Sequence, residues 1–317
     1  MTKPRRILIT GATGCAGFYL SGLALEKGMH VFGFANLGRF APGVTGHVGE
    51  TTRRNDLEAC LNKSMPDLVF HLAALVHGAG VHAPKAMLRV NIEGTHHLLE
   101  AVRKIVPKAR VLVAGSSAIY GQPGNPGKPI AETAPLQPRS TYAVSKAAQD
   151  LMAQQFFLEH GLHVVRGRTF NQTGPREPEG LVCAMLARQL AGIEAGRQEP
   201  VLRVISLTTR RDFCDVRDVV AGYWAALEHG APGEAYNICS GNSHSIRHVV
   251  DILLSHSRAG EVRIEETELH PDPRAILDQT GDSSRLAACS GWRPRITLEQ
   301  SLGDLLEEWR LKVRRES

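Results

Sequence analysis

Apolar runs and helical patterns alternate along the first 170 residues of the chain. A short apolar run covers residues 6–10, and a run of this length between a basic segment and a glycine is typical of a buried strand. Residues 18–25 then show a helical pattern, and residues 29–34 form a second apolar run. Strand, turn, helix and strand within about 30 residues predict a βαβ unit with parallel strands.

The alternation continues and then loosens. We expect a strand at residues 67–74, a long helix at 87–106 that Pro107 ends, and further strands at 109–115 and 163–170. The later elements follow one another less regularly, as in a second, smaller lobe. The chain therefore predicts an α/β fold, with a doubly wound parallel Rossmann sheet and a smaller C-terminal α/β substrate lobe. The predicted dinucleotide-binding domain covers 1–170 with 215–240 returning to it, and the substrate lobe covers 171–214 and 241–317.

Three glycines lie in the turn between the first strand and the first helix. Gly11 would permit the tight turn, Gly14 would let the backbone approach a pyrophosphate, and Gly17 would let the helix pack against the sheet. The amides at the N-terminus of that helix would then face the phosphates. A glycine triplet alone is weak evidence, but in this strand–turn–helix context it predicts a bound dinucleotide.

The end of the second strand bears on which dinucleotide is bound. An Asp or Glu at this place would accept hydrogen bonds from the adenosine ribose of NAD, and residues 35–39 contain neither. Asn36 is neutral, and Arg39 could pair with a 2′-phosphate. We therefore expect NADP, with NAD kept as the alternative.

A tyrosine and a lysine four residues apart, Tyr142 and Lys146, lie in a stretch with a helical pattern that Gly161 would end. This spacing places both side chains on one face of a helix. A phenol has a pKa of about 10, and a nearby ammonium lowers it, so that the tyrosine can exchange a proton with a carbonyl or alcohol oxygen. The pair alone also fits a solvated helix face. Ser116 strengthens the catalytic interpretation, because it follows a strand at the edge where open parallel sheets bind ligands.

Composition narrows the function classes. The 317 residues carry a net charge of +5, but the 37 basic residues are scattered, which disfavours nucleic acid and favours an anionic small substrate. The six cysteines show no metal spacing, and His244 and His248 lack the acidic partner of a zincin helix. Free cysteines suit a reducing compartment, and no apolar run approaches the roughly 20 residues of a membrane helix. We therefore expect a cytoplasmic protein with no metal, membrane or nucleic-acid partner.

Five separated motifs together resemble the extended short-chain dehydrogenase/reductase family, the NAD-dependent epimerase/dehydratase family. They are the glycine triplet, His71-Leu-Ala-Ala74, Asn91, Ser116 four residues before Tyr120, and Tyr142-x-x-x-Lys146. The resemblance implies that Tyr142 donates or accepts the proton, Lys146 holds the nicotinamide ribose and lowers the pKa of the tyrosine, and Ser116 binds the reacting oxygen. With Asn36 and Arg39 included, the expected cofactor contacts are Gly11, Thr13, Gly14, Cys15, Ala16, Gly17, Asn36, Arg39, Asp56, Leu57, Leu72, Ala73, Ala74, Asn91, Tyr142, Lys146 and Phe170.

Motifs further along the chain resemble the GDP-6-deoxy-D-mannose reductase branch of that family. They are Arg168-Thr-Phe-Asn171-x-x-Gly174-Pro175, Arg211-Asp-Phe213, Tyr236 to Gly241, Asp272-Pro-Arg274 and Gly291-Trp-Arg-Pro294. The resemblance makes the second lobe a nucleotide-sugar lobe and implies a homodimer. The expected substrate contacts are Ser116, Ser117, Asn171, Arg211 and Arg274.

The expected function is NAD(P)H-dependent reduction of a nucleotide-4-keto-6-deoxyhexose of the GDP-4-keto-6-deoxymannose type. Two alternatives stay open. One is a nucleotide-sugar 4-epimerase with tightly bound NAD, and the other is a non-catalytic dinucleotide sensor, which the intact Ser116, Tyr142 and Lys146 disfavour. A 4,6-dehydratase is not expected, because dehydratases of the family carry an acidic residue at the position of Ala118.

Overall fold

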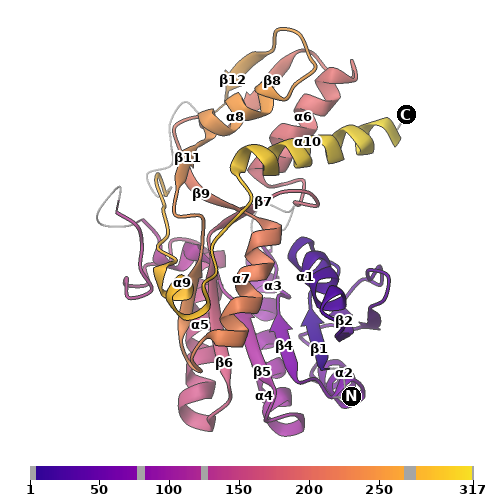
Figure 1. Ribbon diagram of the computed structural model, residues 1–317, viewed down its shortest axis with the longest axis vertical. Helices are drawn as coiled ribbons and strands as arrows, with labels where there is room; N and C mark the ends of the chain where they lie inside the picture. The colour runs from indigo at the N-terminus through magenta and orange to yellow at the C-terminus, as the bar shows by residue number, and fades with distance from the viewer. Residues whose placement is uncertain (1–4, 77–82, 123–127, 268–275, 316–317) are drawn as a thin grey trace.

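A seven-stranded sheet occupies the lower part of the molecule (Figure 1). The computed structural model describes residues 5–76, 83–122, 128–267 and 276–315. The strands lie in the order β10-β6-β5-β4-β1-β2-β3, and each neighbouring pair is parallel. The order runs outward in both directions from the centre, which confirms the predicted doubly wound sheet. Its strands are β1 (Arg6–Thr10), β2 (His30–Ala35), β3 (Thr45–Val48), β4 (Leu68–His71), β5 (Arg110–Ala114), β6 (Val164–Thr169) and β10 (Ala235–Ile238).

Both faces of the sheet are buried. Along β1, Ile7 and Ile9 pack on one face and Leu8 on the other. Successive side chains of a strand point to opposite faces, so a strand that is covered on both sides is apolar throughout. The helices on the face of Ile7 are α1 (Cys15–Glu26) and α7 (Val216–His229), and those on the face of Leu8 are α2 (Arg54–Ser64), α4 (Gly94–Ile105) and α5 (Thr141–His160).

The long helix predicted at residues 87–106 is divided in the structure. A short helix, α3 (Pro84–Leu88), runs into a π-helical turn, η1 (Arg89–Glu93), before α4 begins. Asn91 is fully buried in this turn, where it accepts from the Leu75 N–H at 2.8 Å and donates to Ser145 Oγ at 2.9 Å. The turn therefore holds the loop after β4 against α5, and π-turns are frequent at functional sites.

The helix that carries the Tyr-x-x-x-Lys pair begins and ends as predicted. Ser140 is the N-cap of α5 and accepts from the Ala143 N–H at 3.1 Å. Gly161 ends the helix with φ 65°, the left-handed conformation that glycine adopts without strain. A short 3₁₀ turn after β5, η2 (Ser117–Tyr120), packs against α5. Ser116 thus lies between the carboxyl end of β5 and the first turns of α5.

A second lobe lies above the sheet (Figure 1). A separate apolar cluster joins its helices, which supports the proposed two-lobe division. Leu286 and Trp292 come from the C-terminal part of the chain but pack into the cluster of the large sheet. The lobe contains α6 (Val182–Glu194), α8 (Ile246–Ser255), α10 (Leu298–Arg315), a sheet of β11 (Ser243–Ser245), β9 (Arg210–Asp215) and β7 (Asn171–Thr173), and a pair of β12 (Arg263–Glu266) with β8 (Val201–Val204), while α9 (Ser284–Ser290) contacts α7.

Candidate active site

Gly11 and Gly17, on either side of the turn after β1, lie too close to other backbone atoms to carry a side chain. Gly11 has φ +71°, and a Cβ there would lie 2.9 Å from the Ala73 nitrogen. A Cβ at Gly17 would lie 2.2 Å from the Gly11 oxygen. Gly14 is the N-cap of α1 and has no side chain to accept from the amides of the first turn, so these amides are left for another acceptor. The turn therefore fits the phosphates of a dinucleotide.

A cavity of about 310 Å³ lies beside this turn. Glu50 and Thr51, between β3 and α2, line it although no motif pointed to them. Arg39 is exposed at the end of β2 and does not line the cavity. The predicted contacts that do line it are Gly11, Thr13, Gly14, Asn36, Leu72, Ala73 and Ala74.

Two predicted cofactor contacts, Asp56 and Leu57, do not line this cavity. Leu57 is fully buried in the core between α2 and the sheet. Asp56 accepts a hydrogen bond from the Glu50 N–H at 3.0 Å. Neither lines the cavity, because α2 turns this part of its surface toward the sheet and toward the segment before it. Asp56 supports Glu50, which does line the cavity.

Three other predicted cofactor contacts lie outside this cavity. Ala16 and Phe170 line the neighbouring cavity around Tyr142. The Cys15 thiol faces the Pro175 carbonyl at 3.5 Å, and burial together with the nearby Glu177 raises its pKa to about 12. Cys15 is therefore a protonated contact between the two lobes and not a reactive thiolate.

Ser116, Tyr142 and Lys146 line one cavity of about 340 Å³. Leu72 and Ala74 line both this cavity and the one at the glycine turn. A long ligand can therefore extend from the turn to the tyrosine. The structure brings the three residues together because β5 ends where α5 begins, and the four-residue spacing turns both α5 side chains to the same side.

The two titratable groups of this cavity have shifted pKa values. Burial raises the pKa of Tyr142, and its hydrogen bond with Ser116 opposes part of that shift. Burial lowers the pKa of Lys146 to about 7. The Lys146 Nζ donates to the Ala114 carbonyl and to Gln149 Oε1, both at 2.8 Å. The lysine is thus held in place before any ligand binds.

The second lobe supplies the other wall of the cavity. Asn171 and Arg211 line it as predicted, and Arg274 lies outside the described residues. Ser117 also lines it, but its hydroxyl donates to Gln279 Oε1 at 2.8 Å, and Gln279 Nε2 donates back to the Ser117 carbonyl at 3.0 Å. Gln279 was missed, because it is 162 residues from Ser117 and only the fold brings them together.

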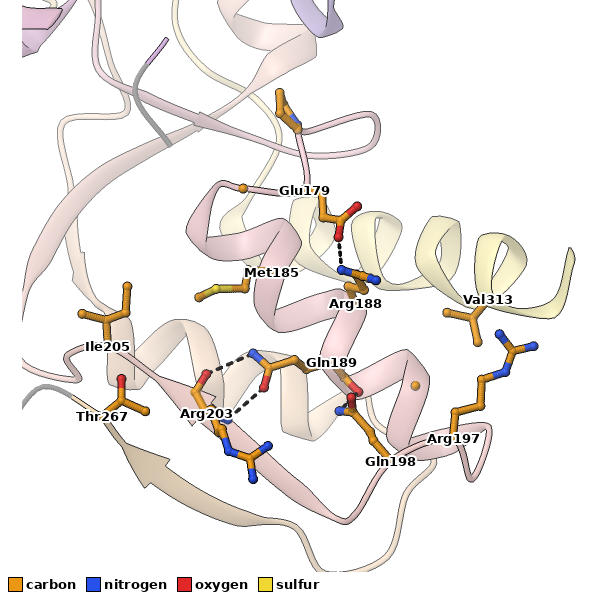
Figure 2. Close-up of a pocket in the computed structure, with 13 residues that line it drawn as sticks. Glu179, Met185, Arg188, Gln189, Arg197, Gln198, Arg203, Ile205, Thr267 and Val313 are labelled. Atoms are coloured by element: carbon orange, nitrogen blue, oxygen red, sulfur yellow. Dashed lines mark hydrogen bonds and ion pairs between the residues drawn. The ribbon is translucent and has the colours of Figure 1, made fainter. Parts of the chain in front are cut away.

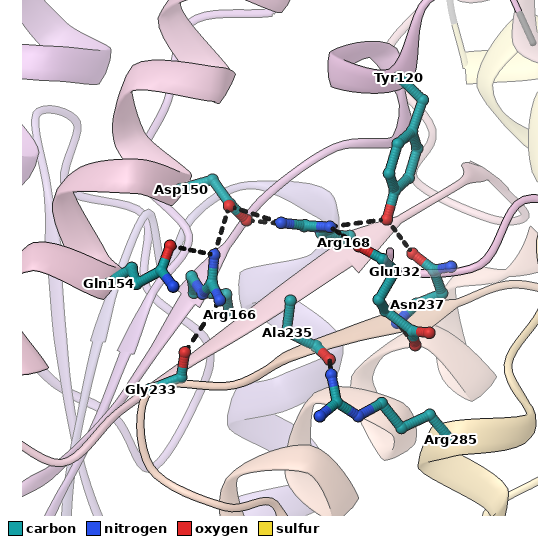
Figure 3. Close-up of polar contacts among 10 residues, drawn as sticks. All are labelled: Tyr120, Glu132, Asp150, Gln154, Arg166, Arg168, Gly233, Ala235, Asn237 and Arg285. Carbon is teal, nitrogen blue, oxygen red and sulfur yellow. Dashed lines mark hydrogen bonds and ion pairs between the residues drawn. The ribbon is translucent and has the colours of Figure 1, made fainter. Parts of the chain in front are cut away.

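A buried charge cluster lies beneath the cavity. Figure 3 shows Asp150 of α5 between two arginines of β6, with Arg166 Nη1 at 2.7 Å from Oδ2 and Arg168 Nη2 at 2.8 Å. Arg168 Nη1 also donates to the Tyr120 hydroxyl at 3.0 Å and to the Glu132 carbonyl at 2.8 Å. One guanidinium therefore joins α5, β6 and η2, the elements around the tyrosine and the serine.

A model of the GDP-mannose 4,6 dehydratase family matches residues 8–305. The chain belongs to this family. It is 34% identical over 258 residues to the GDP-6-deoxy-D-mannose reductase of Pseudomonas aeruginosa, which covers 80% of this chain and 83% of that protein. It is also 28% identical to GDP-mannose 4,6 dehydratase 1 of Arabidopsis thaliana, over 97% of this chain and 91% of that protein. These matches confirm the predicted family.

Solved structures of relatives have the same fold. The P. aeruginosa RMD complexed with NADPH superposes with a TM-score of 0.85 at 30% identity, covering 97% of this chain and 99% of that one. The UDP-glucose 4-epimerase of Thermus thermophilus with NAD gives a TM-score of 0.84 at 26% identity, covering 96% and 99%. Reductases, epimerases and dehydratases therefore share this architecture, and the residues of the cavity must separate them.

A larger cavity, of about 870 Å³, lies in the second lobe. Figure 2 shows its wall, where Gln189 bonds the backbone of Arg203 and Arg188 pairs with Glu179. None of the predicted site residues lines it. The carboxylate that lines it, Glu179, is paired with Arg188, so the volume of this cavity alone does not make it the active site.

The structure offers no metal site in the part of the chain that it describes. His244 and His248 do not share a helix as their spacing predicted, because His244 lies on β11 and α8 begins at Ile246. Their rings still stack, with centroids 5.1 Å apart. Among the described helices, none is long and apolar enough to cross a membrane.

Proposed function

We propose that this chain is an NAD(P)H-dependent reductase of a nucleotide-4-keto-6-deoxyhexose, of the GDP-4-keto-6-deoxymannose type. The observation that carries the proposal is the convergence of Ser116, Tyr142 and Lys146 in a cavity that continues to the glycine turn. The similarity to the P. aeruginosa reductase supports the substrate class.

The residues of the cavity can perform each protein-supplied part of a carbonyl reduction. The nicotinamide, when bound, supplies the hydride. Burial raises the pKa of Tyr142, so the phenol keeps its proton at neutral pH and can donate it to the oxygen that gains negative charge. Ser116 can bind the same oxygen by a hydrogen bond. Lys146, fixed at Ala114 and Gln149, has one N–H of its ammonium left for the cavity that Tyr142 also lines.

The second lobe suits the anionic end of a nucleotide sugar. Arg211 lines the cavity beside Asn171, and a guanidinium binds diphosphate oxygens through two parallel hydrogen bonds. Burial lowers the pKa of Arg211 from its usual value, although the group keeps its charge at neutral pH. Arg211 is half-buried, and no carboxylate of the described residues forms an ion pair with it, which favours an anionic ligand.

We propose NADPH as the preferred reductant. Asn36 at the end of β2 lines the cavity and is neutral, so no acid at that position repels a 2′-phosphate. Glu50 is the acid that lines the cavity, and Arg53 lies 3.4 Å from its carboxylate. The relative solved with NADPH supports this choice, and the epimerase solved with NAD supports the alternative.

A dehydratase activity is not proposed, in spite of the name of the family. Elimination of water from a hexose needs an acid or base beside the carbon that loses a proton. Ala118, which occupies the acidic position of the dehydratases, lines the cavity and cannot transfer a proton. Reduction of a ketone needs no such group, so the residues present suffice for it.

We also propose a homodimer that forms through α5. Val144, Leu151 and Leu158 are spaced by seven residues on one face of this helix and are exposed by 46%, 53% and 72%. Leu88 of α3, which packs against α5, adds to the same apolar surface. A second copy of the chain would cover both.

Incubation of the purified protein with a 4-keto-6-deoxy nucleotide sugar and NADPH tests the function. We expect one NADPH to be oxidised for each ketone reduced, with activity depending on added cofactor. Incubation with the parent hexose nucleotide and no reductant should give no 4-keto-6-deoxy product. Formation of that product would establish a dehydratase, and turnover with NAD that co-purifies would establish an epimerase.

A further inference from the structure

A network of hydrogen-bonded, buried polar side chains runs from Lys146 away from the active-site cavity. Lys146 Nζ donates to Gln149 Oε1 at 2.8 Å, and Gln149 Nε2 donates to Thr95 Oγ1 at 2.7 Å. Thr95 Oγ1 lies 2.9 Å from His71 Nε2, and His71 Nδ1 lies 2.7 Å from Thr10 Oγ1. Except for Lys146 at 4%, each of these side chains is wholly buried.

The positions of the protons in this network can be assigned by elimination. Thr95 Oγ1 lies 2.6 Å from the Asn91 carbonyl oxygen, and two oxygens at that distance need a proton between them. Because a hydroxyl has one proton, Thr95 accepts from every other partner. The Gln149 amide donates to it, and so must His71 Nε2.

The same argument gives the position of the ring proton of His71. With its proton on Nε2, the neutral His71 has an acceptor at Nδ1, which accepts a hydrogen bond from the Thr10 hydroxyl. Thr10 then accepts from the Ala73 N–H at 3.3 Å. Burial, together with the charge of Lys146, lowers the pKa of His71 to about 3. Each of these hydrogen bonds then has one donor and one acceptor.

We propose that Gln149 is a positioning residue that holds Lys146 toward the cavity, and that the neutral His71 anchors Gln149 through Thr95. The inference rests on the proposed function, since it concerns the lysine of that site. The Gln149 amide nitrogen donates to Thr95, so the amide oxygen faces Lys146 and accepts from it. The Lys146 ammonium therefore has one orientation, with two of its protons used at Ala114 and Gln149 and one left for the cavity.

The network also connects Lys146 to the cavity at the glycine turn. Thr10 is the last residue of β1, directly before Gly11, and its partner Ala73 lines the cavity at the glycine turn. Gly11 and Ala73 approach so closely that a Cβ at Gly11 would meet the Ala73 nitrogen at 2.9 Å. Five hydrogen-bonded side chains thus link the two ends of the expected cofactor contacts, with Gln149 and His71 both donating to Thr95.

Nitrogen NMR of His71 in the cofactor-free protein tests the assigned proton positions in the network without any assay of activity. We expect the assigned ring nitrogens to show a neutral imidazole protonated at Nε2, unchanged from about pH 8 to about pH 5, since the pKa of this group is about 3. A proton on Nδ1, or a charged ring in this range, would overturn the proposal. This result is independent of whether the protein is a reductase.

Variants of Gln149 test the effect on the lysine. Gln149→Met keeps the side-chain volume but removes both hydrogen bonds, so we expect NADPH to bind about tenfold more weakly and kcat to fall by a similar factor, from the loss of a bond to a charged group. The KM for the sugar nucleotide should stay unchanged, because Arg211 and Asn171 lie on other elements. Gln149→Glu restores the acceptor for Lys146 and should recover most of the NADPH affinity.

The same substitution at an exposed place on α10, Gln300→Met, is the matched control and should change neither constant. Equal losses for NADPH and for the sugar nucleotide in Gln149→Met would indicate a general loosening of the fold and would contradict a positioning role. Wild-type NADPH affinity in Gln149→Met would contradict it as well. If the protein has no reductase activity, the dissociation constant for NADPH still decides the question.

Discussion

At the scale of single residues, the environment of the Tyr142 cavity decides which proton each group carries. Burial raises the pKa of Tyr142 and lowers that of Lys146. Both shifts favour the neutral form, as expected for groups removed from water. A tyrosine that keeps its proton suits the reduction of a ketone, in which the enzyme must supply a proton to the product oxygen.

Removal of the phenol hydroxyl should abolish this step. In Tyr142→Phe we expect kcat to fall by about 10² to 10⁴-fold, the usual contribution of general acid catalysis. NADPH affinity should be largely unchanged, because Lys146 and the glycine turn remain. Single-turnover kinetics with fluorescence titration of the cofactor measures both quantities. A variant with wild-type kcat would assign the proton donor to another group.

The lowered pKa of Lys146 predicts a pH dependence of stability. The pKa falls from 10.5 to about 7 on folding, so between these values the unfolded chain binds a proton that the folded protein does not. The free energy of unfolding therefore rises with pH across this window. Urea unfolding of the cofactor-free protein and of Lys146→Met at about pH 7 and about pH 10 measures it. The variant should show the smaller rise, and equal rises would contradict the shift.

At the scale of secondary-structure elements, α5 is the part of the fold on which the site depends. It carries Tyr142 and Lys146 in its first two turns, and its Asp150 is fixed to β6 by two buried arginines. Arg166 and Arg168 compensate one carboxylate, and Arg168 also joins Tyr120 of η2. The position of the helix relative to Ser116 is therefore set by a charge cluster as well as by apolar packing.

The cluster predicts a large cost for removing its one anion. Asp150→Asn leaves two buried guanidiniums without a carboxylate, which should lower the free energy of unfolding by about 3–5 kcal/mol. Asp251→Asn on α8 is the matched control, since its pair with Arg247 spans 3.9 Å between exposed side chains and should matter by less than about 1 kcal/mol. Denaturant unfolding of both variants provides the comparison, and a cost at Asp150 no greater than the control's would refute the role of the cluster.

At the scale of the whole molecule, the site exists only where the two lobes meet. The loop after β5 supplies Ser116 and α5 supplies Tyr142 and Lys146, while Arg211 and Gln279 come from the second part of the chain. Gln279 bonds the backbone of Ser117 and so joins this segment to η2. A ligand that touches the tyrosine and Arg211 therefore contacts both lobes at once.

The proposed dimer also belongs to this scale. Leu151→Glu places a charge in the centre of the exposed face of α5, where it would be buried in the proposed interface, so we expect the variant to be monomeric. Leu311→Glu on α10, where the leucine is also 53% exposed, is the control and should leave the assembly unchanged. Light scattering after size exclusion measures the mass. A wild-type monomer, or a dimer that survives in Leu151→Glu, would exclude this interface.

The sequence by itself determined the parts that depend on local rules. The apolar runs marked buried strands such as β1, the glycine spacing marked the turn before α1, and Gly161 marked the end of α5. The pair Tyr142 and Lys146 could be identified because a helix converts a spacing of four into a shared face. Such features need only a few neighbouring residues, so the pattern along the chain contains them.

The tertiary structure alone decided which distant residues meet. Glu50 and Thr51 line the cavity at the glycine turn and Leu57 does not, because packing of α2 against the sheet turns Leu57 inward. Gln279 reaches Ser117, and Thr10, His71, Thr95 and Gln149 join behind Lys146, although at least 24 residues separate each neighbouring pair that the fold brings together. A hydrogen bond depends on the distance between two atoms, and for residues far apart in the chain that distance is set by the packing of the whole fold.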